Sequence, residues 1–129
     1  MAKVMKYVDS TGTEHMNSYW ALTDIDIRRR KTYGEFGWTG FHDRAAYESG
    51  YEPIGYYSFK VSGNEFLFWY LKHITEQIDI GKIAYMIAAT RIDTPTTPRV
   101  ENQIFPGNVV QQVKIPQFKH FFEGATDDI

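Results

Sequence analysis

The sequence predicts an α+β domain in which an antiparallel sheet or a small β-sandwich packs against one or two helices. Residues 19–29 alternate between two faces with the two-residue period of a β-strand, and residues 33–41 provide a return strand. Residues 63–78 instead carry apolar side chains at three- and four-residue spacings, the period of an amphipathic helix. A chain of 129 residues fits one such unit, so we expect a single domain over residues 1–129.

The first part of the chain is expected to be mostly strand. Residues 3–8 form a short strand candidate that ends in the turn-rich sequence Asp9-Ser10-Thr11-Gly12. The hairpin of residues 19–29 and 33–41 follows. Glycines in its return strand predict bulges, or places where large aromatic side chains cover bare backbone, at Gly34, Gly37 and Gly40.

Cap residues predict where a first, short helix begins and ends. Asp43 is placed to cap a helix over residues 44–49, which Gly50 would end. Residues 54–61 then form a strand that is rich in tyrosine and phenylalanine.

The clearest local signal is a capping box at Ser62 and Glu65, in which each side chain binds the backbone N–H of the other residue. The helix of residues 63–78 is expected to begin there. Its apolar stripe consists of Phe66, Leu67, Tyr70, Leu71, Ile74 and Ile78. Asp79 can cap a second helix over residues 79–91, although the β-branched residues of this segment also suit a buried strand.

The last third of the chain has a different composition. Prolines predict an extended polar loop over residues 93–98, because each proline fixes its own backbone and keeps its predecessor out of the helical region. A turn is expected at residues 105–108, followed by a last strand over residues 109–115 that Pro116 ends. Residues 117–129 then form a C-terminal arm, long enough to extend up to roughly 45 Å and lie on a neighbouring subunit.

Composition excludes several classes of function. The 14 basic and 16 acidic side chains give a formal net charge of −2, so nucleic-acid binding is not expected and no field draws the chain to anionic lipid. The sequence has no cysteine, which removes thiol nucleophiles and cysteine-based metal sites. No run of about 20 apolar residues is present and the N-terminus lacks a secretory signal, so we expect a soluble protein made in a cytoplasm.

Motifs for catalysis or cofactor binding are not found, so we expect no catalytic residue, cofactor or metal ion. No two histidines have the spacing of a local metal pair, and a metal site assembled from distant residues is left as an alternative. Asp24, Asp26 and Arg28 share one strand face, where a solvated or ion-paired row is the simplest explanation. The basic cluster of residues 28–31, with Arg28 and Arg30, is interpreted as a solvated tip or an ion-paired contact to another subunit.

Aromatic residues make up 16% of the chain, which is more than a core of this size easily hides. Some of them are therefore expected to meet a partner. Flat rings such as Trp38 and Tyr56 would also suit a platform that stacks against sugar, so a carbohydrate- or receptor-binding module is the alternative function.

The stretch from Ser18 to Tyr70 resembles small virion structural proteins of tailed bacteriophages, of the kind found at tails, baseplates or as capsid decorations. The resemblance lies in an order of features: the hairpin of residues 19–27 and 37–41, then Asp43-Arg44-Ala45-Ala46, Gly50 and Pro53-Ile54, then residues 57–66. It implies a non-enzymatic virion component, made in the host cytoplasm and present in several symmetric copies that contact one another and other virion proteins.

Residues expected at such subunit contacts are basic, aromatic or placed in the C-terminal arm: Arg28, Arg30, Trp38, Tyr56, Phe118, Phe121 and Phe122.

Overall fold

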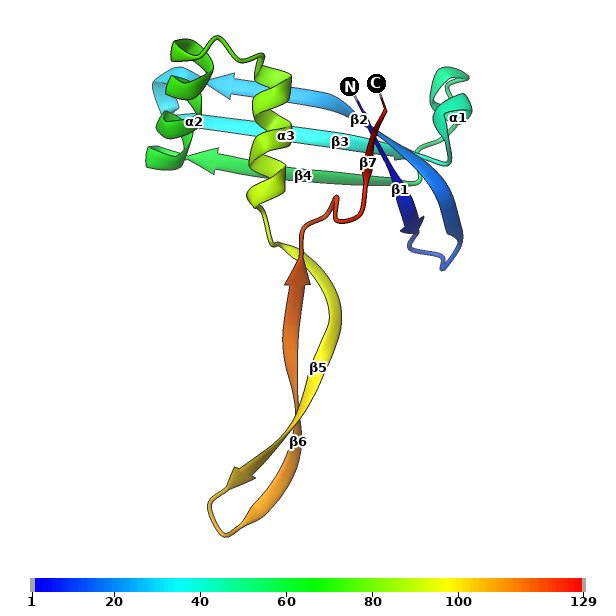
Figure 1. Cartoon of the computed structure of the whole chain (residues 1–129), viewed down its shortest axis with the longest axis vertical. Helices are drawn as coiled ribbons and strands as arrows, with labels where there is room; N and C mark the ends of the chain where they lie inside the picture. The colour runs from blue at the N-terminus through cyan, green and yellow to red at the C-terminus, as the bar shows by residue number, and fades with distance from the viewer. Residues whose placement is uncertain (1, 129) are drawn as a thin grey trace.

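The computed structural model describes residues 2–128 (Figure 1). The strands are β1 (Ala2–Val8), β2 (Glu14–Arg28), β3 (Tyr33–Phe41), β4 (Gly55–Ser62), β5 (Thr94–Phe105), β6 (Val109–Lys119) and β7 (Thr126–Asp128). The helices are α1 (Arg44–Glu48), α2 (Gly63–Thr75) and α3 (Ile80–Thr90), and a 3₁₀ turn, η1 (Arg29–Lys31), joins β2 to β3. The terminal residues Met1 and Ile129 lie outside the described part.

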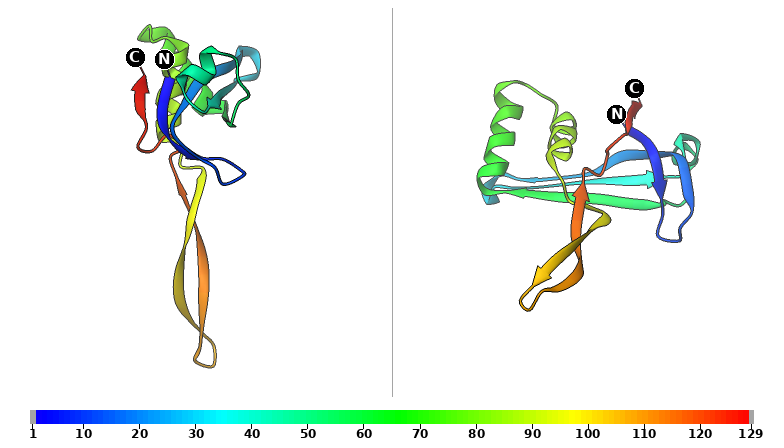
Figure 2. Two further views of the ribbon diagram at one scale, coloured as in Figure 1. Left: turned by 90° about the vertical axis from the view of Figure 1, so that its right-hand side faces the viewer. Right: turned by 60° about the horizontal axis from the view of Figure 1, so that its bottom comes forward.

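Five strands form one antiparallel sheet in the order β4-β3-β2-β1-β7, and α2 and α3 lie over one face of it (Figure 1). The other two strands, β5 and β6, pair with each other in a hairpin that projects away from this body (Figures 1 and 2). The predicted α+β class is therefore confirmed, in the form of an antiparallel sheet packed against helices.

The core lies between the sheet and the two helices. Alternate residues of β4 are buried while their neighbours are exposed, as the two-residue period of a strand requires. Helix α3 contributes a continuous buried face, made of Ile83, Ala84, Ile87 and Ala88. The segment of residues 79–91, for which the sequence left helix and strand open, is thus a helix, capped by the Asp79 side chain on the backbone N–H of Gly81 at 2.9 Å.

The predicted β2–β3 hairpin is present, and aromatic side chains cover the backbone at two of its glycines, as the sequence suggested. Trp20 pairs with Gly40 across the hairpin and its ring lies on the bare backbone there, so that a Cβ atom at Gly40 would lie only 2.5 Å from the ring. Tyr56 covers Gly37 in the same way on the opposite face of the sheet. A bulge between Leu22 and Asp24 adjusts the register of β2 against β3.

The cap expected at Asp43 is confirmed, since its carboxylate accepts from the backbone N–H of Ala46 at 2.7 Å. The capping box at Ser62 is wrong, because Ser62 makes no side-chain cap. Its backbone continues β4, and the Glu65 carboxylate is taken by Arg91 instead of reaching back. The helix nevertheless begins at Gly63, as the sequence predicted, with Ser62 at its N-cap position in the extended conformation usual for such a residue.

Two expectations for the last third of the chain are also wrong. The prolines of residues 93–98 do not leave a loop, because Pro95 lies in β5, which begins at Thr94. Pro116 does not end β6, which continues to Lys119. Both strands lie at the edges of a two-stranded ribbon, where a residue without an N–H is tolerated.

The C-terminal arm expected over residues 117–129 is not present as such. Residues 117–119 belong to β6, and residues 126–128 form β7, which pairs with β1. Between them, Phe121 stacks on Tyr57 with ring centroids 4.2 Å apart and an interplanar angle of 5°. This part of the chain closes its own core instead of lying on a neighbour.

We therefore predict that Phe121→Ala lowers the free energy of unfolding by about 3 kcal/mol, the lower end of the range for removing a packed phenylalanine. The matched control is Phe118→Ala, three residues earlier, because Phe118 is 52% exposed on the hairpin and should change stability little. Urea denaturation followed by tryptophan fluorescence would measure both. Equal effects of the two substitutions would contradict the packing described here.

Candidate interaction site

The hairpin of β5 and β6 is the most unusual feature of the molecule. Its strands have 12 and 11 residues, which corresponds to a length of roughly 40 Å. No residue of either strand is buried, and neither strand pairs with the main sheet (Figure 2). A two-stranded ribbon of this kind is at best marginally stable in water without further packing.

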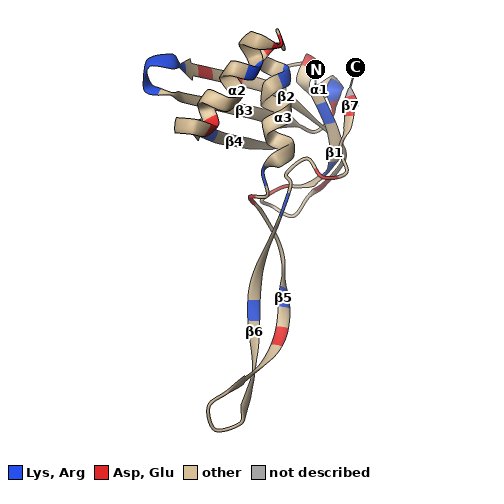
Figure 3. Ribbon diagram, turned by 60° about the vertical axis from the view of Figure 1, so that its left-hand side comes forward, with Lys and Arg blue, Asp and Glu red and all other residues tan. Residues whose placement is uncertain are grey.

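The outer half of the hairpin, residues 102–113, is called the distal hairpin below. It contains no charged residue, and the charges of the hairpin lie nearer its base (Figure 3). Apolar side chains appear on both of its faces. On one face Ile104 is 76% and its cross-strand partner Val110 is 62% exposed, and on the other face Phe105 pairs with Val109.

Both edges of the distal hairpin are open. The prolines of the strands are all near the base, at Pro95, Pro98 and Pro116, while Pro106 lies in the connecting turn. The outer half therefore keeps backbone N–H and C=O groups on β5 and β6 that no strand within residues 2–128 satisfies. Natural edge strands are usually protected by lysines, prolines or bulges, and residues 102–105 and 109–113 have none of these.

The base of the hairpin, in contrast, is fixed to the body. The Tyr57 hydroxyl donates to the Asp93 carboxylate at 3.0 Å, just before β5 begins. A ring nitrogen of His120, just after β6 ends, binds the carbonyl oxygen of Arg91 at 2.9 Å. Burial, and then the neighbouring Asp93, raises the pKa of the Tyr57 hydroxyl above its usual range, so this group stays a hydrogen-bond donor.

The residues predicted at interfaces separate into two groups in the structure. Trp38 is 0% exposed and packs against Tyr57 and Phe59, so its assignment to an interface is wrong. Phe121 and Phe122 are likewise packed against the core. Like the exposed Phe118, these residues have polar neighbours in the sequence, and only the tertiary contacts separate buried from exposed aromatics.

The remaining candidates are exposed but lie far apart in the fold. Arg28 and Arg30 lie where β2 ends and η1 follows, and Arg28 pairs with Asp26 at 3.2 Å. Tyr56 is 55% exposed on the open face of the sheet and donates to Asp24 at 2.9 Å. Phe118 is on the hairpin.

The distal hairpin itself was missed by the sequence reasoning. One signal for it is present in the sequence, namely twelve consecutive residues without a charge that include Ile104, Val109 and Val110. In a domain with 23% charged residues, such a stretch indicates a segment that is either core or covered by a partner.

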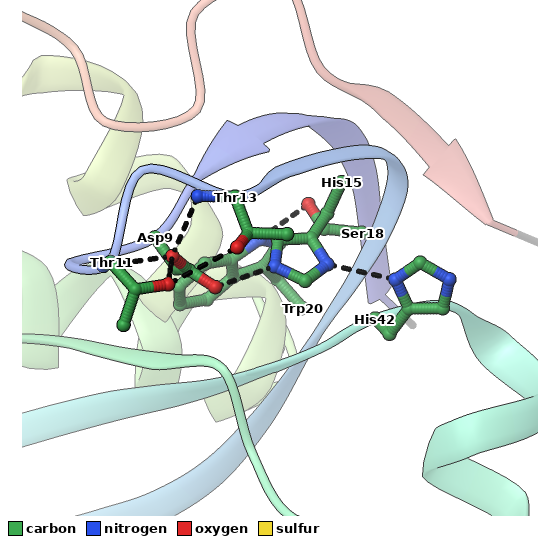
Figure 4. A network of polar contacts seen from close by, with 7 residues as sticks. All are labelled: Asp9, Thr11, Thr13, His15, Ser18, Trp20 and His42. Carbon is green, nitrogen blue, oxygen red and sulfur yellow. Dashed lines mark hydrogen bonds and ion pairs between the residues drawn. The ribbon is translucent and has the colours of Figure 1, made fainter.

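Apart from the hairpin, a polar cluster joins residues that are far apart in the sequence (Figure 4). His15 is buried between two partners: its Nε2 donates to the Asp9 carboxylate at 2.8 Å, and its Nδ1 lies 2.8 Å from Nδ1 of His42. One of the two facing nitrogens donates and the other accepts. The Asp9 carboxylate also accepts from the backbone N–H groups of Thr11 and Thr13.

This cluster ties the β1–β2 turn to the corner where β3 leads into α1. The hydrogen bond from His15, and then that from the Thr11 hydroxyl, hold the pKa of the Asp9 carboxyl well below its usual range. His42 is exposed on its outer side. Across residues 2–128, no group of three or more His, Asp or Glu side chains is placed to hold a metal ion.

The sequence matches no family model, and comparison with curated proteins and with solved structures finds no match either. Among the helices of the described part of the chain, none is both long and apolar enough to cross a membrane.

We predict that Asp9→Asn destabilises the protein at neutral pH and that this difference disappears in acid. Because the folded-state pKa of Asp9 is lowered, its stabilising contribution is complete above the unfolded value of about 4 and is lost as the pH falls through the lower folded value. Urea denaturation at pH 7 and at pH values from about 4 downwards would measure it. Asp26→Asn is the control, since Asp26 pairs only with the exposed Arg28 and such pairs contribute little. A neutral-pH stability of Asp9→Asn equal to that of the unsubstituted protein would contradict the role of the cluster.

Proposed function

We propose that this chain is a non-enzymatic structural subunit of a bacteriophage virion, a tail, baseplate or capsid component that acts through contacts with copies of itself and with other virion proteins. The observation that carries the proposal is the distal hairpin. It is a long projection without a charge in its outer half, with apolar side chains on both faces and open edges. The virion assignment itself comes from the resemblance of residues 18–70.

Exposure of the distal hairpin to water is unfavourable. Ile104 and Val110 expose most of their surface to water, and apolar area removed from water stabilises a contact by about 25 cal/mol per Å². An uncovered edge of this composition also promotes uncontrolled pairing with other chains. A specific partner that covers the distal hairpin would remove both the exposed apolar area and the open edges. This favours a role in assembly.

A firm attachment of the hairpin supports the same proposal. An arm that hung on a loose linker would lose more conformational entropy on binding. Here Tyr57 binds Asp93 on one side of the base and Phe121 stacks on Tyr57 on the other, so the direction of the hairpin is set before a partner arrives.

A carbohydrate-binding module and an enzyme both have less support. A sugar-stacking platform built on Trp38 would need that ring at the surface, and the ring is buried. An enzyme that used Asp24 or Asp26 with a histidine would need the carboxylate and the imidazole ring close together. His15 and His42 instead bind each other, and His15 also binds Asp9.

The proposal predicts that the purified protein forms oligomers whose native mass rises with concentration, and that Ile104→Lys combined with Val110→Glu prevents this. These two residues are cross-strand partners, so the introduced charges can pair across the ribbon and preserve it while the apolar surface is lost. Light scattering would give the mass and thermal melting the stability, which should be unchanged because both positions are exposed.

Met16→Lys is the matched control, because Met16 is 62% exposed on β2, away from the hairpin, and its substitution should leave assembly intact. Electron microscopy of the assembled protein is expected to show regular symmetric particles or filaments. A monomer at every concentration, or amorphous aggregates alone, would refute the structural-subunit proposal.

A further inference from the structure

Helix α2 has a second apolar face that the fold leaves open. Phe66 points into the core and is 3% exposed. The predicted apolar stripe of this helix is nevertheless not buried as a whole, since Leu67 is 42%, Leu71 is 56% and Ile74 is 51% exposed. Together with Phe68, at 61%, these residues form what we call the outer face of α2. A helix that is apolar on two sides is typical of one that is covered on two sides.

No described segment of the same chain covers this face. The hairpin leaves the body at the C-terminal end of α3 and points away from α2 (Figures 1 and 2). Its base is held by the bond of Tyr57 to Asp93, so the hairpin cannot swing back onto α2 without breaking its anchor.

We propose that the outer face of α2 binds the distal hairpin of a second copy of this chain. This inference rests on the proposed function and goes further, because it names the surface that receives the arm. The two surfaces are the large apolar ones that the same chain leaves open, and they lie on separate elements that cannot meet within one molecule.

The two surfaces match in charge. The distal hairpin has no charged residue, and neither does the run of α2 from Phe66 to Leu71. The charges at the rim of this run are already paired within the chain: Glu65 binds Arg91, and Lys72 binds Glu76 at 2.9 Å. Docking an uncharged ribbon here therefore leaves no unpaired charge in the contact, which would otherwise be strongly unfavourable.

The two surfaces also match in size. Helix α2 has 13 residues and is about 20 Å long. The distal hairpin, with about five residues per strand and its turn, extends for roughly 15–20 Å. Its more exposed face, with Ile104 and Val110, would lie along Leu67 and Leu71, since each of these side chains is at least 42% exposed.

Such a contact has a consequence for symmetry. The hairpin of one copy would occupy α2 of the next, whose own hairpin stays free for a third copy. A contact between two different surfaces of the same chain produces a closed ring or an open filament, according to the rotation between neighbours. Hairpin-to-hairpin pairing would instead use the same surface on both copies.

The absence of cysteine from the sequence allows a direct test by cross-linking. Ile104→Cys and Leu71→Cys are prepared as separate single-cysteine proteins that carry tags of different size, mixed in equal amounts and oxidised. A disulfide forms only where the two Cα atoms come within about 7 Å. We expect the mixed dimer to exceed the random mixture severalfold. Tyr51→Cys is the control partner for Ile104→Cys, because Tyr51 is 67% exposed but lies outside both surfaces.

The outcomes separate this inference from the proposed function. Dominant homodimers of Ile104→Cys, with the oligomer mass intact, would overturn the α2 contact and leave the structural-subunit proposal standing. Absence of every cross-link in a protein that stays monomeric would overturn both. As a second measurement, Leu71→Lys should lower the oligomer mass without changing thermal melting, and assembly equal to that of the unsubstituted protein would overturn the α2 contact.

Discussion

A two-stranded β-ribbon has no interior, so the hairpin of β5 and β6 cannot bury its own apolar side chains. Each side chain of β5 and β6 faces water on one side or the other, so Ile104, Val110 and their neighbours cannot be buried by the hairpin alone. Such a ribbon persists in an evolved sequence when something else covers it. Residues 102–113 fit this condition, because they have no charged side chain that would oppose contact with a partner. The same lack of charge leaves the strand edges unprotected when no partner is bound.

The body of the protein fixes the base of this ribbon. Trp20 lies on the bare backbone of Gly40 and fixes the hairpin of β2 and β3, while Tyr57 receives Phe121 from the end of the chain and donates to Asp93 at the start of the ribbon. The aromatic residues that the composition suggested as interface residues are used mainly here, inside the body. The contact surfaces that we propose, on the distal hairpin and on the outer face of α2, are aliphatic for the most part.

Local patterns predicted the local structure well. The strand predicted over residues 19–29 and the cap at Asp43 depend on neighbours in the sequence, and both are present. The predicted alternation of two faces is interrupted by the bulge between Leu22 and Asp24, so that Ile27 packs against the core on the same side as Trp20 and Leu22. Features that depend on distant partners were not predictable. Phe118 and Phe121 look alike in the sequence, and only the stacking on Tyr57 makes one of them core. His15 and His42 lie 27 residues apart, so their contact had no spacing to reveal it. Ser62 is at the N-cap position that the sequence predicted, but Glu65 of the expected capping box binds the distant Arg91 instead.

Hydrogen–deuterium exchange of the hairpin amides, in dilute and in concentrated solution, tests most directly whether the distal hairpin is covered in the working state. In the dilute protein, amides on the open edges of residues 102–105 and 109–113 should exchange rapidly, because none of the strands that the structure describes pairs with these edges. In the concentrated protein we predict that their exchange slows by at least tenfold, together with that of α2, while the exchange of β3 stays the same. Equal exchange of the distal hairpin at both concentrations, in a protein whose mass does rise, would show that assembly uses another surface and would contradict the account.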